Sequence, residues 1–87
     1  MEARALVAWN LRRLRVRRGI SQEQLALGAE VDVTYVSGIE RALRNPTIMV
    51  LERLATALDV RIGEFFLTPR MGAKRPSTLP KGRPSRS

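Results

Sequence analysis

The 87-residue chain contains neither cysteine nor histidine. Their absence excludes disulfide scaffolds, zinc fingers, thiol nucleophiles and histidine general bases. No run of about 18 apolar residues is present, so the sequence predicts no membrane-spanning helix, no membrane partner and a cytoplasmic location. The eight acidic residues form no paired carboxylates, and no glycine-rich phosphate loop is visible. We therefore expect no enzyme activity, no metal and no cofactor.

Basic charge is concentrated at the C-terminal end. The chain has 16 Lys and Arg residues against 8 Asp and Glu, a formal charge of +8. Residues 68–87 hold 6 of the basic residues and no acidic one, which leaves only +2 for residues 1–67. The same segment is rich in Pro, Gly and Ser and too poor in apolar side chains to fold alone. The sequence thus predicts one folded domain at 1–67 and a disordered basic tail at 68–87.

Apolar residues at helical spacing indicate an all-α fold. The pattern predicts five helices: at about 3–18, from 22 onwards, and at about 33–41, 48–58 and 62–66. Gly19 suits the left-handed end of the first helix. The fourth helix carries a core stripe of Ile48, Leu51, Leu54, Ala55 and Leu58. Because neighbouring residues on a helix point in different directions, one of Phe65 and Phe66 should pack inward while the other reaches a partner subunit.

The segment 21–45 is typical of two short helices joined by a tight turn. Ser21 followed by Gln24 forms a capping box that starts a helix at Gln22. Asp32 is the expected N-cap of the second helix. Free backbone N–H groups at the start of the first of these helices can meet a phosphate. Two such helices in sequence predict a helix-turn-helix motif, which points to DNA.

The second of these helices has two distinct faces. With Val36 set inward and about 100° per residue, Ile39 also turns inward and Glu40 lies close to the buried side. The opposite arc carries Thr34, Ser37 and Arg41, flanked by Val33 and Gly38. Short hydroxyl side chains, a methyl group and an arginine suit a surface that meets base edges and phosphates.

Several runs together match a known pattern over about 6–67. They are 11–15 (LRRLR), 19–26 (GISQEQLA), 36–41 (VSGIER), 44–47 (RNPT) and the helix that ends at 58–60 (LDV). The chain resembles the Xre family of Cro and phage-repressor-like helix-turn-helix regulators, and 34–41 most resembles the controller proteins of restriction-modification systems. The resemblance implies a compact five-helix lambda-repressor-like domain. It further implies a sequence-specific transcriptional regulator that binds double-stranded DNA at a pseudo-palindromic operator as a homodimer.

The resemblance and the helix faces assign roles to single residues. Base reading is expected of Val33, Thr34, Ser37 and Gly38. Phosphate binding is expected of Gln22, Tyr35, Arg41, Arg44 and Asn45. The dimer interface is expected to include Val60, Ile62, Phe65 and Phe66. Family members pair an arginine with a glutamate at the positions of Arg15 and Glu40, so we expect a partly buried ion pair there. The other arginines of the first helix should form a mainly solvated face, with Arg17 or Arg18 near phosphate.

Two positions depart from the usual pattern. The turn between the two short helices usually has glycine where this chain has Glu30, and a left-handed conformation there would cost on the order of 1 kcal/mol. Controller-like relatives often carry arginine at the position of Val33. Valine donates no hydrogen bond, so it can only contact a thymine methyl. We therefore expect modest intrinsic specificity, supplemented by indirect readout.

Other classes of function stay open on the sequence alone. One alternative is an antitoxin that covers a toxin with its tail or with a face around Trp9. Trp9 lies opposite the core face of the first helix, where it either rests on arginine stems or contacts another protein. Regulation would follow from blocking RNA polymerase or from contacting it, and the sequence does not decide between these two. A second alternative is a nonspecific nucleic-acid binder driven by the basic tail, although a near-neutral domain with few aromatics does not favour a stacking platform.

Overall fold

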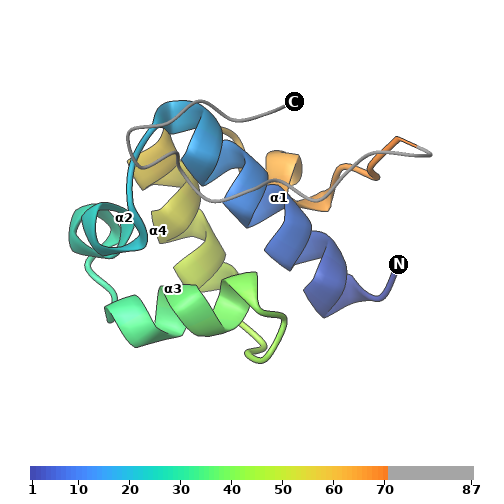
Figure 1. The fold of residues 1–87 in the computed structure, drawn as a ribbon, viewed down its shortest axis with the longest axis horizontal. Coiled ribbons are helices and arrows are strands. Elements are labelled where there is room, and N and C mark those ends of the chain that lie inside the picture. Colours follow the sequence, from blue (N-terminus) through green and yellow to red (C-terminus); the bar gives the residue numbers. More distant parts are fainter. Residues whose placement is uncertain (71–87) are drawn as a thin grey trace, which may run out of the picture.

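A computed structural model describes residues 1–70, which form four α-helices and one 3₁₀ helix (Figure 1). The elements are α1 (Ala3–Arg18), α2 (Gln22–Ala29), α3 (Val33–Glu40), α4 (Ile48–Leu58) and η1 (Ile62–Phe66). No strand occurs in this part of the chain, so the all-α prediction is confirmed. None of the helices described is long and apolar enough to cross a membrane. Most of the predicted tail, residues 71–87, lies outside the described residues.

Four of the five predicted helices are α-helices, and the short fifth one, predicted near 62–66, is a 3₁₀ helix at Ile62–Phe66. It has five residues and no side-chain cap. Segments this short favour the tighter 3₁₀ hydrogen-bond pattern over a full α-helix. The third helix also ends one residue earlier than predicted, at Glu40.

Side-chain caps fix where the helices begin. The hydroxyl of Ser21 accepts a hydrogen bond from the N–H of Gln24 at 3.0 Å, and the Gln24 side chain accepts one from the N–H of Ser21 at 2.8 Å. Asp32 and Thr47 cap α3 and α4 with their own side chains, which accept from the N–H groups of Thr34 and Val50. The capping box that the sequence predicts is therefore present, and it sets the start of α2.

The ends of α1 and α2 use left-handed residues. Gly19 closes α1 at φ 74°, and Glu30 closes α2 at φ 60°. Glycine adopts this conformation freely, whereas a glutamate carries a steric cost. The turn between α2 and α3 thus has the expected geometry with an unfavourable residue in it.

The core lies between α1, α2, α3 and α4, and α3 runs along the lower edge of the molecule in Figure 1. The central side chains are Leu11, Leu25, Val36, Leu54 and Phe65, each 0% exposed. One residue of the predicted α4 stripe does not join them, since Ile48 is 74% exposed. Ile48 is the first residue of α4, so it lies beyond the part of the helix that packs on its neighbours.

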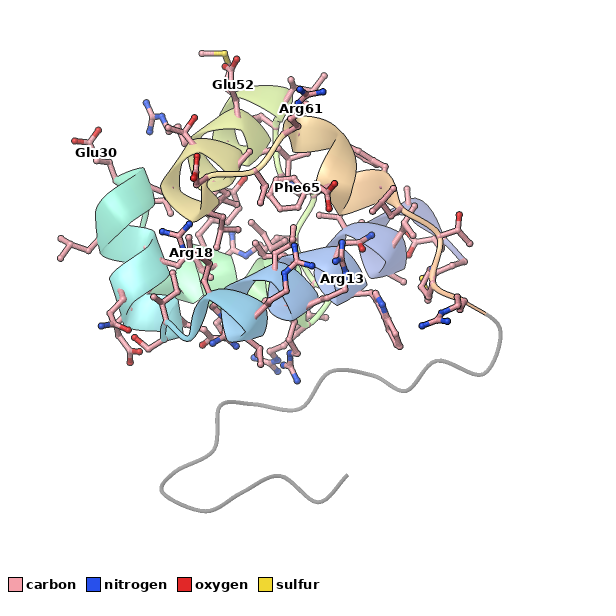
Figure 2. The ribbon with its side chains drawn as sticks, turned by 90° about the horizontal axis from the view of Figure 1, so that it is seen from above. Arg13, Arg18, Glu30, Glu52, Arg61 and Phe65 are labelled. Atoms are coloured by element: carbon pink, nitrogen blue, oxygen red, sulfur yellow. The ribbon has the colours of Figure 1, made fainter. Side chains whose placement is uncertain are left out.

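The segment after α4 is tied back to α1 by buried polar contacts. The side-chain amide of Asn10, 1% exposed, donates to the carbonyls of Phe65 and Leu67, both at 2.9 Å. Arg13 donates to the carbonyl of Glu64 at 3.4 Å. Figure 2 shows the Phe65 ring turned into the space between η1 and α1. These contacts hold Phe65 in the core, and the sequence pattern did not identify Asn10 as their centre.

Candidate nucleic-acid interface

The outward face of α3 begins at its N-terminal cap. Asp32 accepts hydrogen bonds from the Thr34 N–H at 2.8 Å and from the Thr34 hydroxyl at 2.7 Å. The hydroxyl bond is the main reason that the pKa of Asp32 lies below its ordinary value, with the Thr34 N–H and the positive charge of Arg44 acting in the same direction. Thr34 is exposed and Ser37 is half-buried. Because the Thr34 hydroxyl proton is engaged, this residue offers an acceptor and a methyl group to a ligand.

Gly38, which periodicity places on the outward side of α3, is not exposed. It is buried, because the side chain of Arg44 lies across it. A Cβ atom on Gly38 would lie only 2.5 Å from Cγ of Arg44. The base-reading role of Gly38 stays a prediction, and in this structure its lack of a side chain makes room for an arginine.

Tyr35 and Arg44 are also in contact. The guanidinium carbon of Arg44 lies 5.7 Å from the centroid of the Tyr35 ring, within the range of a cation–π interaction. Tyr35 is half-buried, while Arg44 remains exposed. The structure thus brings together Tyr35, Gly38 and Arg44 from α3 and the loop that follows it.

The loop after α3 leaves the helix through a tight turn at Ala42. Ala42 has φ 60°, its N–H donates to the Ile39 carbonyl at 3.0 Å, and the next N–H, from Leu43, donates to the Gly38 carbonyl at 2.8 Å. Such bonds satisfy the last carbonyls of a helix, usually with glycine at the left-handed position. An alanine at this position gives no sequence signal for the turn. The turn is followed directly by the exposed residues Arg44 and Asn45.

Glu40, which is only 1% exposed, lies at the centre of a group of charged side chains. Arg15, itself 4% exposed, donates through Nε to one carboxylate oxygen of Glu40 and through Nη2 to the other, the latter at 3.0 Å. Arg15 also donates to the carbonyl of Ile20 at 3.0 Å. This bidentate pair joins α1 to the end of α3.

Two further residues donate to the same carboxylate. Arg12 Nε lies 3.3 Å and Gln22 Nε2 lies 3.1 Å from Oε1 of Glu40. We call Arg12, Arg15, Gln22 and Glu40 the Glu40 cluster. Arg12 is thus not part of a solvated face, and the Gln22 amide donates to Glu40 in this structure while its phosphate-binding role stays a prediction. The cluster links α1, α2 and α3 and so fixes the orientation of α3.

Two other arginines of α1, Arg13 and Arg18, also donate to groups elsewhere in the protein. Arg18 donates to the carbonyl of Leu58 at 3.0 Å, which satisfies the C-terminal end of α4. Arg13 donates to the side-chain oxygen of Asn10 at 3.2 Å and lies 3.5 Å from the carboxylate of Glu64. One N–H group of Arg18 is therefore engaged by α4, although Arg17 and Arg18 are both exposed. The approach of either residue to phosphate stays a prediction.

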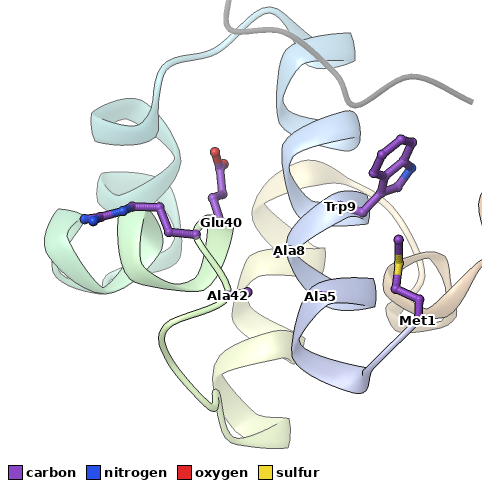
Figure 3. A pocket seen from close by; sticks show the side chains of 7 residues that line it. Met1, Ala5, Ala8, Trp9, Glu40 and Ala42 are labelled. Carbon is purple, nitrogen blue, oxygen red and sulfur yellow. The ribbon is translucent and has the colours of Figure 1, made fainter.

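Trp9 is half-buried at the edge of a shallow hollow between α1 and the loop after α3. Met1, Ala5, Ala8 and Ala42 line the same hollow, and Figure 3 shows Trp9 beside Met1. The walls of the hollow are mainly apolar, and Glu40 contributes to them from the C-terminal end of α3.

A second apolar surface lies on and after η1. Ile62 is 36% exposed, Phe66 and Leu67 are each 48% exposed, and Val60 is half-buried. Phe65, predicted for the same interface, is fully buried in the core, so its side chain is not available to a partner subunit. The adjacent phenylalanines thus divide as the helix geometry requires, with Phe66 outward.

Comparison with known proteins finds one family over most of the described chain. A family model described as helix-turn-helix matches residues 11–65. A hypothetical transcription factor of Neisseria meningitidis serogroup B is 41% identical over 69 residues, which cover 79% of this chain. The chain spans 65% of the length of that relative.

Solved structures agree with this similarity. The crystal structure of the Neisseria transcription factor superposes with a TM-score of 0.75, over 78% of each chain. The restriction-modification controller protein C.AhdI from Aeromonas hydrophila is 41% identical, with a TM-score of 0.71 over 72% of this chain and 96% of the other. The controller protein C.Esp1396I, solved as a tetramer with its natural 35 base-pair operator, is 38% identical, with a TM-score of 0.70 over 76% and 87% of the two chains.

Proposed function

This chain belongs to the helix-turn-helix family of transcription regulators, and we propose that it binds a pseudo-palindromic DNA operator as a homodimer. The observation that carries the proposal is the group of exposed residues Arg41, Arg44 and Asn45 beside the outward face of α3. Cations with free N–H groups next to short polar side chains form a surface suited to phosphates and base edges. The controller protein C.Esp1396I, which was solved in complex with its operator, supports DNA binding as the function.

In this proposal, residues in the first turns of α3 contact the base edges. Thr34 presents its methyl group and an acceptor oxygen, and Ser37 presents a hydroxyl. Val33 packs partly against the core, and the part of its side chain that remains exposed suits a thymine methyl. Arg41, Arg44 and Asn45 bind the phosphates of the DNA backbone beside these bases. With no bidentate donor on the outward face of α3, sequence preference depends partly on DNA shape.

The homodimer is joined through the apolar surface on and after η1. Val60, Ile62, Phe66 and Leu67 provide side chains that a second copy would cover. A two-fold arrangement presents two copies of α3 about one DNA turn apart, roughly 34 Å. An operator with two similar half-sites at that spacing follows from this geometry.

The division of the chain also has a functional consequence. The domain at 1–67 determines which DNA sequence is preferred. The basic segment at 68–87 adds an attraction to phosphate that is independent of DNA sequence. Its contribution falls as salt rises, because binding releases counterions from DNA. Removal of 69–87 should flatten the salt dependence and leave the preferred duplex unchanged.

Fluorescence anisotropy with the full chain tests the proposal. The probes are the DNA upstream of its own gene and a scrambled duplex of the same composition, both at near-physiological salt. We expect at least a hundredfold preference for the upstream DNA, within the usual range for specific over nonspecific binding. Equal and steeply salt-dependent binding to both duplexes would instead describe a nonspecific nucleic-acid binder.

A further inference from the structure

We propose that Gly38 and Tyr35 are positioning residues that hold the Arg44 side chain against α3, so that its guanidinium meets DNA from one fixed place. The inference rests on the proposed DNA-binding function and assigns Gly38 a role other than base reading. Three independent features support it: the space at Gly38, the aromatic ring at Tyr35 and the acidic cap at Asp32.

The space at Gly38 is the strictest of these features. A Cβ atom there would lie 2.5 Å from Cγ, 3.2 Å from Nε and 3.4 Å from Cδ of Arg44. The first distance is shorter than any tolerable contact, and it involves the middle of the arginine side chain, which cannot yield without moving the whole side chain. Any larger residue at position 38 must therefore displace Arg44 from α3.

Tyr35 supports the far end of the same side chain. Its ring centroid lies 5.7 Å from the guanidinium carbon, and its half-buried position limits movement of the ring. Tyr35 and Gly38 are three residues apart on α3, so they lie on the same side of the helix. The stem and the head of Arg44 are thus held by two neighbouring positions of one helix.

The charge at the start of α3 acts in the same direction. Asp32 is fixed by two hydrogen bonds from Thr34, and the positive charge of Arg44 contributes to the lowered pKa of its carboxyl group. Asp32 therefore attracts the guanidinium toward the first turn of α3, where the proposed base-reading residues lie. Arg44 remains exposed in this position, so its N–H groups are available to a ligand.

Holding the side chain matters because a free arginine loses rotamer entropy when it binds. A planar guanidinium that is already oriented loses less of this entropy and favours bidentate contact with phosphate or a base edge. The position of Arg44 should therefore affect affinity even though Gly38 itself never contacts DNA.

The test is Gly38→Ala in the full chain. We expect binding to the preferred duplex to weaken by about tenfold, in the range of a lost charge-assisted hydrogen bond. The melting temperature should not fall, because alanine favours helix over glycine. Gly28→Ala is the matched control: it is also a helical glycine, but a Cβ atom there makes only an ordinary 3.6 Å contact with Ala57. It should leave the affinity unchanged.

A double-mutant cycle identifies the route of the effect. If Gly38→Ala acts by displacing Arg44, it should add no further loss in an Arg44→Ala background. Equal losses in both backgrounds would overturn the inference, because the new methyl group would then clash with DNA directly. Wild-type affinity of Gly38→Ala would overturn it as well. Failure of the wild-type chain to prefer any duplex would instead contradict the proposed function.

Tyr35 variants keep the inference testable should Gly38→Ala fold poorly. Tyr35→Leu removes the aromatic ring without adding bulk, and Tyr35→Phe retains the ring and removes only the hydroxyl. We expect a larger loss of affinity for Tyr35→Leu than for Tyr35→Phe, and we expect that difference to disappear in the Arg44→Ala background. A difference that persists without Arg44 would show that the ring does not act through it.

Discussion

The arginines of α1 and those that follow α3 have the same charge but opposite surroundings. Arg12 and Arg15 donate to the buried carboxylate of Glu40, whereas Arg41 and Arg44 are exposed. Net charge is therefore a poor guide to the DNA-binding surface of this domain. Several cations of α1 are used to fix helices to one another, so a nearly neutral domain can still present a basic surface at one edge.

The two groups also differ in what their removal should do. Removing one side of a buried ion pair leaves the other side with neither solvent nor a counter-charge, which lowers the stability of the fold. An exposed arginine keeps its hydration, so its loss changes stability little and changes attraction to phosphate directly. Substitutions in the two groups should separate stability from DNA binding.

Glu40→Ala should produce the largest effect. It leaves Arg12, Arg15 and Gln22 without their common acceptor, and we expect a loss of about 3 kcal/mol in the free energy of unfolding. Urea denaturation followed by circular dichroism measures it, with Glu23→Ala on the exposed face of α2 as control. An unchanged urea midpoint for Glu40→Ala would show that the Glu40 cluster does not hold the helices together.

Arg44→Ala and Arg12→Ala should behave in opposite ways. Loss of Arg44 should weaken binding to the preferred duplex by about tenfold and lower the slope of log affinity against log salt by about 1, with little change in stability. Loss of Arg12 should lower stability and leave that slope unchanged. Anisotropy titrations at several salt concentrations and thermal melts distinguish the two. Similar effects of both variants would remove the distinction between the two groups of arginines.

Glu30→Gly should increase stability while leaving DNA binding intact. Glycine adopts the left-handed conformation of the turn after α2 without the steric cost of glutamate, and we expect a gain of about 1 kcal/mol. Glu30→Gln is the control for the lost charge, and urea denaturation measures both variants. A loss of stability in Glu30→Gly would indicate that the glutamate side chain makes a contact that offsets the backbone cost.

Asp32 should produce the smallest effect, and a pH-dependent one. Its pKa in the folded protein is lowered, chiefly by the Thr34 hydroxyl, so its ionised form favours folding. This contribution is complete above the ordinary pKa of aspartate, about 4, and is lost as the pH falls through the lower folded value. The difference in urea midpoint between wild type and Asp32→Asn should therefore shrink on acidification. A difference that grows as the pH falls would mean that the ionised form of Asp32 does not favour folding.

Local chemistry made much of the fold predictable. Ser21 and Gln24 form their capping box within three residues of one another, and the start of α2 follows from it. The left-handed residue at Glu30 was predictable from the position of the turn. The left-handed Ala42 was not, because alanine carries no preference for that conformation and the turn depends on how the chain continues toward α4.

The candidate site was predictable in its location but not in its internal contacts. Helical periodicity correctly placed Thr34 and Ser37 toward the outside and Val36 inside. Periodicity gives only the direction of a side chain from its own helix, however, and cannot say what lies above it. Gly38 has an outward direction and is nevertheless buried, because Arg44 returns from the following loop to cover it.

The sequence by itself determined where the helices begin, the helix-turn-helix motif and the edge of the domain that carries exposed cations. These features depend on capping and periodicity, which act over a few residues. Only the tertiary structure decided that Arg12 and Gln22 join Glu40, that Asn10 anchors the segment after α4, and that Arg44 lies on Gly38. For the hydrogen bonds the physical reason is distance along the chain: Arg12 and Glu40 are 28 residues apart and Asn10 and Phe65 are 55 apart, so these bonds exist only once the helices have packed. Arg44 is close to Gly38 in the sequence, but its contact depends on the path of the loop after α3, which periodicity does not predict.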